Sequence, residues 1–346
     1  MTLNVGVIGV GMIGQDHIRR LTHVVAGARV SAVTDVDLDR AKLVAASLPA
    51  AKALQTGQEL IADSEVDAVV VASWGPTHEE YVLAGIEAGK QVFCEKPLAT
   101  TREACERILD AEVAAGKRLV MVGFMRRYDE GYRAMKQVID SGEIGTPLMF
   151  HSGHRNPSVP LYFSRDMVIN DTCVHDVDIA RFLLDSEIVA VRVLAARKGL
   201  LASGHPTDPV LVLFEMANGA LVDVEASVSI QYGYDIRGEI VGERGTVELA
   251  ETNGAVVKSN GRWGGRVPED WRERFLRAYD TEFQEWIAAA SRGESTGPSA
   301  WDGYAATVVG DAGLTALKTG ERVAVSMREQ PELYQPAPGA SPAETD

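Results

Sequence analysis

The segment from Asn170 to Asp178 brings two carboxylates and an imidazole together in a pattern that could move a proton. Asp171, His175 and Asp178 stand at positions i, i+4 and i+7, so on a helix they share one face. A carboxylate one turn from an imidazole can hold the tautomer of the ring and stabilise its protonated form, as a general base for an alcohol requires. The alternative is that Asp171 caps a helix and His175 is an ordinary surface histidine.

A lysine stands in a second position suited to chemistry. Lys96, within Glu95-Lys96-Pro97, directly follows the apolar run Gln91–Cys94. If that run is a strand of a parallel sheet, the amine lies at its carboxyl end, where such sheets bind ligands. A cis peptide bond before Pro97 is plausible in such a turn. The alternative, an ordinary surface lysine, is less favoured because of the flanking Glu and Pro and the position at a strand end.

A glycine-rich loop near the start of the chain predicts a dinucleotide site. The pattern GxGxxG follows the apolar run Val5–Ile8, and an acidic residue stands 21 positions after the last glycine. The glycines allow a tight turn and close approach to a pyrophosphate, and the next helix directs its free N–H groups at the phosphate. The carboxylate would accept hydrogen bonds from ribose hydroxyls and repel a 2′-phosphate, which predicts NAD over NADP. The alternative is a glycine-rich turn with no ligand. The predicted contacts here are Gly9, Gly11, Met12, Ile13, Gly14 and Asp35.

Two later segments are expected to lie at the same cofactor. One is Ser73 to His78, where glycine and proline force a turn after an apolar run, and the other is the Glu95-Lys96-Pro97 turn. Both would follow strands at the edge of the sheet that carries the glycine loop. Their predicted cofactor contacts are Ser73, Trp74, His78, Glu95 and Lys96.

A metal site is not expected. His151 and His154 could join His175 and Asp171 as ligands. However, residues three apart on a strand point to different faces, and hydride transfer to NAD needs no metal.

The elements that must position these groups change character near residue 123. Up to that point β-rich runs alternate with helical patterns, which predicts a parallel Rossmann sheet covered by helices over residues 1–123. The predicted strands are Val5–Ile8, Arg29–Thr34, Asp67–Ala72, Gln91–Cys94 and Leu119–Val122. The predicted helices are Met12–His23, Leu38–Leu48, Thr77–Ala88 and Arg102–Ala115, with Thr100 or Thr101 as a cap and Gly89 and Gly116 as stops.

The second part, residues 124–328, is predicted to be an α+β domain on a large, mostly antiparallel open sheet, so the overall class is α/β. Its predicted strands are Pro147–Ser152, Ile188–Ala195, Val210–Met216, Ala220–Ile230, Asp235–Val241 and Thr246–Leu249. Its predicted helices are Glu130–Asp140, Thr172–Leu184, Trp271–Ala290 and Gly303–Lys318. In the helix at Trp271–Ala290, a core stripe is expected at Leu276, Tyr279, Phe283, Ile287 and Ala290. An open sheet face would suit a second subunit, although solvent could also cover it. Residues 329–346 form a polar tail with little to anchor it.

Composition excludes several classes of protein. The chain of 346 residues is long enough for two domains, and 46% hydrophobic with 24% charged residues is typical of a globular protein. A formal charge of −15 argues against nucleic-acid or membrane-surface partners. The first strand begins too early for a signal peptide, and Cys94, Cys105 and Cys173 form no CxxC motif. These features predict a cytoplasmic protein with buried thiols and no membrane span.

Taken together, these motifs resemble the oxidoreductase family named for glucose-fructose oxidoreductase, inositol dehydrogenase and rhizopine catabolism and, within it, the bacterial inositol 2-dehydrogenases. Glu95-Lys96-Pro97 marks only the superfamily, whereas Phe124 to Asp129 and Trp301 to Tyr304 are more specific to the inositol group. The matching stretches run across nearly the whole length: residues 73–78, 94–100, 123–129, 154–156, 171–178, 232–235 and 297–304.

The resemblance implies NAD-dependent oxidation of the axial hydroxyl of myo-inositol to the 2-keto product, scyllo-inosose, by a homotetramer packed through its open sheets. It implies a catalytic set of Lys96, Asp171 and His175, with His175 as the general base. Those three and Arg126, His154, Asp178 and Tyr234 would bind the polyol. Because an ordinary imidazole has a pKa of ~6.5, activity should rise with pH. The alternatives are oxidation of another inositol isomer or of a pyranose such as glucose and, less favoured, a sugar- or NAD-sensing regulator without turnover.

Overall fold

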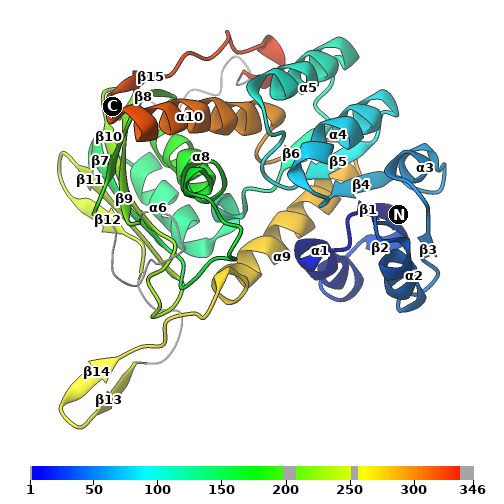
Figure 1. Ribbon diagram of the computed structural model, residues 1–346, viewed down its shortest axis with the longest axis horizontal. Coiled ribbons are helices and arrows are strands. Elements are labelled where there is room, and N and C mark those ends of the chain that lie inside the picture. The colour runs from blue at the N-terminus through cyan, green and yellow to red at the C-terminus, as the bar shows by residue number, and fades with distance from the viewer. Residues whose placement is uncertain (1, 198–207, 251–255, 336–346) are drawn as a thin grey trace. The chain divides into compact units, whose positions relative to one another are not determined.

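The computed structural model describes residues 2–197, 208–250 and 256–335, and the chain forms two compact units (Figure 1). The first unit contains residues up to 125, 279–307 and from 328 onward, and the second contains 126–278 and 308–327. Neither unit is continuous in sequence, because helices α9 (Trp271–Ala290) and α10 (Ala300–Thr319) each begin in one unit and end in the other. The limits predicted at 123/124 and 328/329 follow changes in sequence pattern and stay a prediction. Residues 336–346 of the predicted tail lie outside the described residues.

The first unit is built on a parallel sheet of six strands in the order β3-β2-β1-β4-β5-β6. The order reverses between β1 and β4, so the carboxyl ends of these two strands flank the switch point at which such sheets bind ligands. The Rossmann prediction is confirmed. The strands are β1 (Leu3–Ile8), β2 (Ala28–Thr34), β3 (Lys52–Ala53), β4 (Ala68–Val71), β5 (Gln91–Cys94) and β6 (Val120–Val122). The helices are α1 (Met12–His23), α2 (Leu38–Ala46), α3 (Gly57–Ala62), α4 (His78–Glu87) and α5 (Arg102–Ala115).

Local signals explain the ends of these helices. The Thr101 hydroxyl accepts a hydrogen bond from the Ala104 amide at 3.2 Å and caps α5. Gly89 and Gly116 have φ of +67° and +64° after α4 and α5, a conformation that favours glycine. The sequence gives no prediction for β3 and α3, because two and six residues are too short to establish a period.

The second unit contains a seven-stranded sheet in the order β12-β11-β7-β10-β9-β8-β15. Every pairing in it is antiparallel except that of β7 with β10, which confirms a mostly antiparallel sheet. The strands are β7 (Pro147–Arg155), β8 (Ile188–Ala195), β9 (Val210–Met216), β10 (Leu221–Ser227), β11 (Asp235–Gly242), β12 (Thr246–Glu248) and β15 (Val323–Ala324). Along β9 alternate residues are buried, so one face packs on helices α6 (Glu130–Asp140) and α8 (Val174–Leu184), which Figure 1 shows on the same side of the sheet.

The core prediction for α9 is correct at four of its five positions. Tyr279, Phe283, Ile287 and Ala290 are buried, but Leu276 is 43% exposed. Phe275, the preceding residue, is fully buried and has non-helical angles (φ −112°, ψ 16°). The kink there breaks the helical period, so the assumption of one continuous stripe was wrong at Leu276.

The three cysteines agree with the prediction of buried thiols. Cys94, Cys105 and Cys173 are all buried free thiols. Among the described residues, no helix has both the length and the apolar character needed to cross a bilayer.

Candidate active site

In the first unit, the glycine loop connects β1 to α1. Gly9 has φ of +92°, and a Cβ there would lie 2.6 Å from the backbone of Ala72 and Ser73. A Cβ on Gly14 would lie 2.0 Å from the Gly9 carbonyl oxygen, so this glycine allows the helix to pack against the loop. Apart from its two chain neighbours and the backbone of its own helix, no atom of the described residues lies within 4 Å of a Cβ placed on Gly11. Gly11 therefore borders open space at the N-terminus of α1, as a pyrophosphate cradle requires.

We expect a Gly11→Ala substitution to separate cofactor binding from folding. Gly11 has φ of −72° and ψ of −161°, which alanine adopts without strain, so the melting temperature should stay near that of the wild type. The added methyl group would occupy the space for the pyrophosphate, and we expect NAD to bind about tenfold or more weakly, a loss of about 1.4 kcal/mol. Isothermal titration with NAD and thermal melting would measure both. Gly14→Ala is the contrasting variant, because its clash with backbone should lower the melting temperature as well.

Asp35 lies directly after β2 and is tied into the glycine loop. Its carboxylate accepts hydrogen bonds from the Val10 amide at 2.7 Å, the Asp37 amide at 2.9 Å and the Arg40 guanidinium at 2.6 Å. Burial opposes ionisation of Asp35, but these donors outweigh it and lower the pKa of the carboxyl. The group is therefore anionic and held in place beside the loop, as ribose recognition requires. Arg40 was missed in the sequence, where only its position five residues after Asp35 could have drawn attention.

The loop after β4 is fastened by its own polar side chains. The hydroxyls of Ser73 and Thr77 lie 2.8 Å apart. The buried ring of His78 has one nitrogen 3.0 Å from the Ser73 carbonyl oxygen and the other 2.7 Å from the Pro97 carbonyl oxygen. The ring lies between this loop and the loop after β5, and burial lowers its pKa. The two ring nitrogens of His78 thus lie against protein carbonyls. Trp74, in the same loop, is exposed.

Lys96 follows β5, and its peptide bond to Pro97 is cis. The Glu95 carboxylate accepts a bond from the Lys96 amide at 3.1 Å, and its other oxygen lies 2.7 Å from Nε2 of His17. Arg20 Nη1 lies 3.1 Å from Nδ1 of His17. Because an arginine only donates, His17 accepts at Nδ1 and donates from Nε2 to Glu95. Burial lowers the pKa of His17, and His17 in turn holds the pKa of Glu95 below its usual range.

From these contacts we infer that His17 positions the backbone of Lys96 through Glu95. The His17 ring is fully buried and lies among Phe93, Tyr279 and Phe283, with ring centroids 4.4 to 5.9 Å away. It thus fixes Glu95, which fixes the Lys96 backbone. No spacing rule identifies His17, because it lies on α1, one helical turn after the glycine loop and outside the GxGxxG motif.

We expect His17→Phe to lower kcat more than it raises either KM value. The substitution keeps the aromatic packing but removes the donor to Glu95, so Lys96 loses its fixed position, at a cost of about tenfold to a hundredfold in kcat. Steady-state kinetics would measure the split. His17→Gln, which retains a donor, should recover part of the loss, and His23→Phe at the exposed end of α1 is the control. Normal kcat in His17→Phe, or no recovery in His17→Gln, would refute this role.

In the second unit, a buried cluster of charges surrounds Asp176. Arg126 donates from Nη1 to Asp176 at 2.7 Å, Ser152 donates at 3.0 Å, and Nδ1 of His154 lies 2.7 Å from the other Asp176 oxygen. Arg126, His154 and Asp176 are each no more than 3% exposed. The opposite charge of Arg126 overcomes burial and holds the pKa of Asp176 far below its usual range. The carboxylate therefore stays ionised and fixes the two predicted polyol residues Arg126 and His154.

The cluster also determines the tautomer of His154. Arg126 Nη2 lies 2.9 Å from His154 Nδ1, but a guanidinium cannot accept a proton, whereas the Asp176 carboxylate only accepts. The shorter contact to the anion assigns the proton to Nδ1, which leaves the lone pair of a neutral ring on Nε2. The ring of Tyr234 lies edge-on to that of His154 at 6.0 Å. Burial raises the pKa of Tyr234 to about 12, so its hydroxyl keeps its proton.

His175 lies beside this cluster, with its ring centroid 6.4 Å from that of His154. It stands in the first turn of α8 and is 9% exposed. Asp171 lies before α8, in a π-helical turn over Val168–Thr172. The Cys173 amide bonds the Val168 carbonyl at 3.1 Å, a five-residue step. The predicted helix start at Thr172 was therefore two residues early, and Asp171 does not belong to the same α-helical repeat as His175.

Asp178 is fully buried and pairs with Arg127, a residue for which the sequence pattern predicts no role. Arg127 donates from Nε to one Asp178 oxygen at 2.9 Å and from Nη2 to the other at 2.5 Å. This pair joins α8 to the turn before α6, so Asp178 serves packing there, and its contact with a polyol stays a prediction. Asp176 was missed because it stands next to His175 and falls outside the i, i+4 pattern. The consecutive arginines Arg126 and Arg127 could have signalled two buried carboxylates.

The two strand histidines do point to different faces. His151 lies 2.5 Å from Asp223 on the partly exposed face of the sheet, whereas His154 faces the buried cluster. Within the described ranges, no group of three or more histidine, cysteine or acidic side chains is arranged to hold a metal ion.

The chain is similar to known oxidoreductases over nearly its whole length. Residues 3–124 match an oxidoreductase family with an NAD-binding Rossmann fold, and residues 136–325 match the C-terminal alpha/beta domain of that family. Inositol 2-dehydrogenase 3 of Saccharopolyspora erythraea is 53% identical over 96% of this chain and 98% of the relative. Inositol 2-dehydrogenase of Serratia proteamaculans is 50% identical over 96% and 99%, respectively.

A solved structure gives the same result. The crystal structure of myo-inositol dehydrogenase from Lactobacillus casei, in complex with NAD(H) and myo-inositol, has a TM-score of 0.94 at 39% identity and covers 97% of this chain and all of that one. Apo scyllo-inositol dehydrogenase from the same organism, at 24% identity and a TM-score of 0.87, shows the shared fold alone. The glycine loop, the ionised Asp35 and the open space at Gly11 fit NAD. From these matches and its own geometry, the chain belongs to the oxidoreductase family with an NAD-binding Rossmann fold and a C-terminal alpha/beta domain.

Proposed function

We propose that this protein is an NAD-dependent inositol 2-dehydrogenase that oxidises the axial hydroxyl of myo-inositol to a ketone, giving scyllo-inosose. The observation that carries the proposal is the set of relatives named inositol 2-dehydrogenase, which are 50 to 53% identical across nearly the full length of both chains. The polar cluster around Asp176 supports it, because a polyol needs several fixed donors and acceptors.

In the mechanism we propose, His175 accepts the proton of the ring hydroxyl as general base, with Asp171 stabilising the imidazolium that results. The Lys96 ammonium hydrogen-bonds the substrate oxygen while negative charge grows there. Bound NAD supplies the acceptor for the hydride that leaves the same carbon. Gly9, Gly11, Met12, Ile13, Gly14 and Asp35 would hold the dinucleotide, with Ser73, Trp74, His78, Glu95 and Lys96 bordering it.

Arg126, His154 and Tyr234 would orient the ring through its other hydroxyls. His154 would accept a hydrogen bond at Nε2, whereas Arg126 and the protonated Tyr234 would donate. A substrate that lacks a contacted hydroxyl would leave one of these buried groups without its partner, so the site should reject it strongly.

We further propose a homotetramer that acts in inositol catabolism in the cytoplasm, without a nucleic-acid partner. One face of the seven-stranded sheet carries exposed apolar side chains, including Val189, Leu194, Leu211 and Leu221. Apolar residues on an open sheet face are suited to a second subunit. The formal charge of −15 disfavours polyanionic partners.

A panel of polyols assayed with NAD and with NADP tests the proposed reaction. We expect reduction of NAD to be fastest with myo-inositol and much slower with scyllo-inositol or glucose. With myo-inositol as substrate, reduction of NADP should be much slower than reduction of NAD. A preference for glucose or for another inositol isomer would replace the proposed substrate, since the fold supports such relatives. Binding of NAD and polyols without any turnover would instead indicate a sensing regulator and overturn the enzymatic proposal.

A further inference from the structure

A two-stranded hairpin, which we call the arm, projects from the second unit (Figure 1). It consists of β13 (Val257–Ser259) and β14 (Arg262–Gly264), joined by Asn260 and Gly261 with φ of +51° and +71°. An Asn-Gly pair with both φ positive is the preferred two-residue turn between antiparallel strands. All residues from 256 to 267 are exposed.

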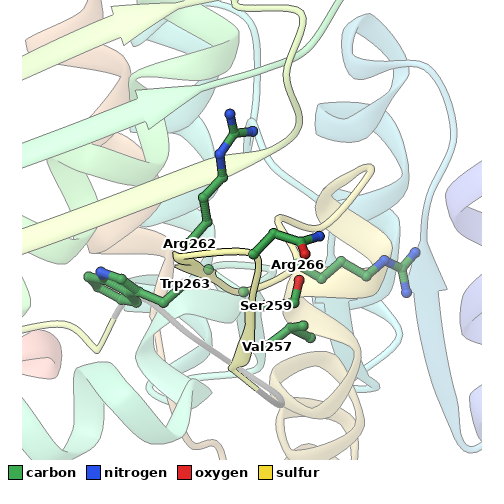
Figure 2. Close-up of a pocket in the computed structure, with 8 residues that line it drawn as sticks. Val257, Ser259, Arg262, Trp263 and Arg266 are labelled. Carbon is green, nitrogen blue, oxygen red and sulfur yellow. The ribbon is translucent and has the colours of Figure 1, made fainter.

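The arm exposes two large apolar side chains to solvent. Trp263 is 77% exposed and Val257 is 63% exposed. Figure 2 shows the Trp263 ring on one side of the hairpin, away from Val257 and Arg266. The hollow in that view is lined by residues of the arm and by Gly265 and Arg266 directly after it, so it is an open surface and not a pocket for a small ligand. A hairpin of two strands is marginally stable by itself, which favours an arm that packs on a further surface.

The charge of the arm is opposite to that of the chain as a whole. Lys258 and Arg262 are basic, and residues 256–267 include no acidic residue, whereas the chain carries a formal charge of −15. Arg266, which follows the arm, pairs with Glu269 and Glu273 of its own chain. Lys258 stands directly opposite Trp263 in the strand register, so a basic and an aromatic side chain share one face. Such a face complements a surface that combines carboxylates with apolar groups.

We propose that the arm docks on the acidic surface of a second copy of this chain. Trp263 is the apolar anchor, and Lys258 on the same face lies against carboxylates of the other copy. Arg262 points to the opposite face of the hairpin and adds to the basic charge of the arm. The acidic chain is itself the matching partner, whereas nucleic acids and anionic membranes are repelled by its overall charge. This inference rests on the self-association proposed above, but it concerns a contact separate from the open sheet face.

A photo-crosslinking experiment on the intact protein tests the arm directly. Trp263 is replaced by p-benzoylphenylalanine. Chains of normal isotope content and chains labelled with heavy isotopes are then mixed, so that peptide masses distinguish links between chains from links within one chain. We expect links between chains from position 263, and their yield should fall as salt is raised. The matched control carries the same group at Leu43, which is 75% exposed on α2, and should give at least fivefold fewer links, a factor equivalent to about 1 kcal/mol.

Light scattering distinguishes failure of the arm from failure of self-association. An oligomer whose position 263 gives no links between chains overturns the arm contact and leaves the oligomer in place. A chain that is monomeric at every concentration overturns both. The charge-reversed variant Lys258→Glu/Arg262→Glu should lose the links while keeping its melting temperature, because both side chains are exposed. Retention of the links in that variant also contradicts the proposed contact.

Discussion

Replacement of His175 by alanine is expected to lower kcat for NADH formation from myo-inositol by about 10²–10⁴-fold. The imidazole is the only group in the proposed mechanism that takes the hydroxyl proton, and alanine at that position cannot accept it. His175 stands on α8 beside the Asp176 cluster and not among the residues of the glycine loop, so NAD affinity should stay within about twofold of the wild type. Initial rates and NAD titrations would measure the two effects.

His151→Ala is the matched control for that variant. Its ring also lies beside a carboxylate, that of Asp223, but on the other face of the sheet. We expect near wild-type turnover from it. Turnover in His175→Ala within about threefold of the wild type would contradict the assignment of the base.

Replacement of Asp176 by alanine should produce the largest loss of stability. The carboxylate is fully buried and is the ionic partner of Arg126, which is only 1% exposed. Removing one member of a buried ion pair leaves the other charge uncompensated, and we expect the free energy of unfolding to fall by about 3–5 kcal/mol. Urea denaturation at one fixed protein concentration would measure this loss.

Two variants make the Asp176 prediction specific. Arg126→Met/Asp176→Leu should recover much of the lost stability, because neither charge is then buried, but it should stay inactive. Asp223→Ala removes a partly exposed carboxylate that also pairs with a histidine and should cost at most about 1 kcal/mol. A cost for Asp176→Ala as small as that for Asp223→Ala would show that the buried cluster is not needed for stability.

The same carboxylate gives the protein a defined response to acid. The pKa of Asp176 is held low in the folded chain by Arg126 and His154, whereas an unfolded aspartate has a pKa of about 3.9. The stabilisation is therefore fully present above that value and is lost as the pH falls through it toward the folded pKa. Stability curves between pH 6 and 3 should fall less steeply for Arg126→Met/Asp176→Leu than for the wild type. Parallel curves would contradict this origin of the acid sensitivity.

The parts of the fold that sequence patterns predicted well are those with strong local rules. Gly9 and Gly14 occupy positions where a Cβ would collide with backbone, so their spacing specified the β1–α1 turn. The long strands of the second unit alternate between a buried and an exposed face, and that period is visible in the residues themselves.

Contacts between side chains on different elements could not be predicted from those local rules. Asp176 and His17 acquire their roles from side chains on other elements, Arg126 and Glu95, which no spacing along the chain brings together. Local departures from regular geometry were also not predicted, because the apolar repeat does not indicate the kink at Phe275. The arm was missed although its Asn-Gly pair is a recognised hairpin signal, because its flanking strands are only three residues long.

In the proposed reaction, hydride passes directly from carbon 2 of myo-inositol to NAD. The most direct test is to incubate the protein with NAD and myo-inositol deuterated at carbon 2 and to record the mass of the NADH formed. We expect each NADH to carry one deuterium, and we expect the deuterated substrate to react more slowly when chemistry limits the rate. Unlabelled NADH, or no NADH at all, would contradict it.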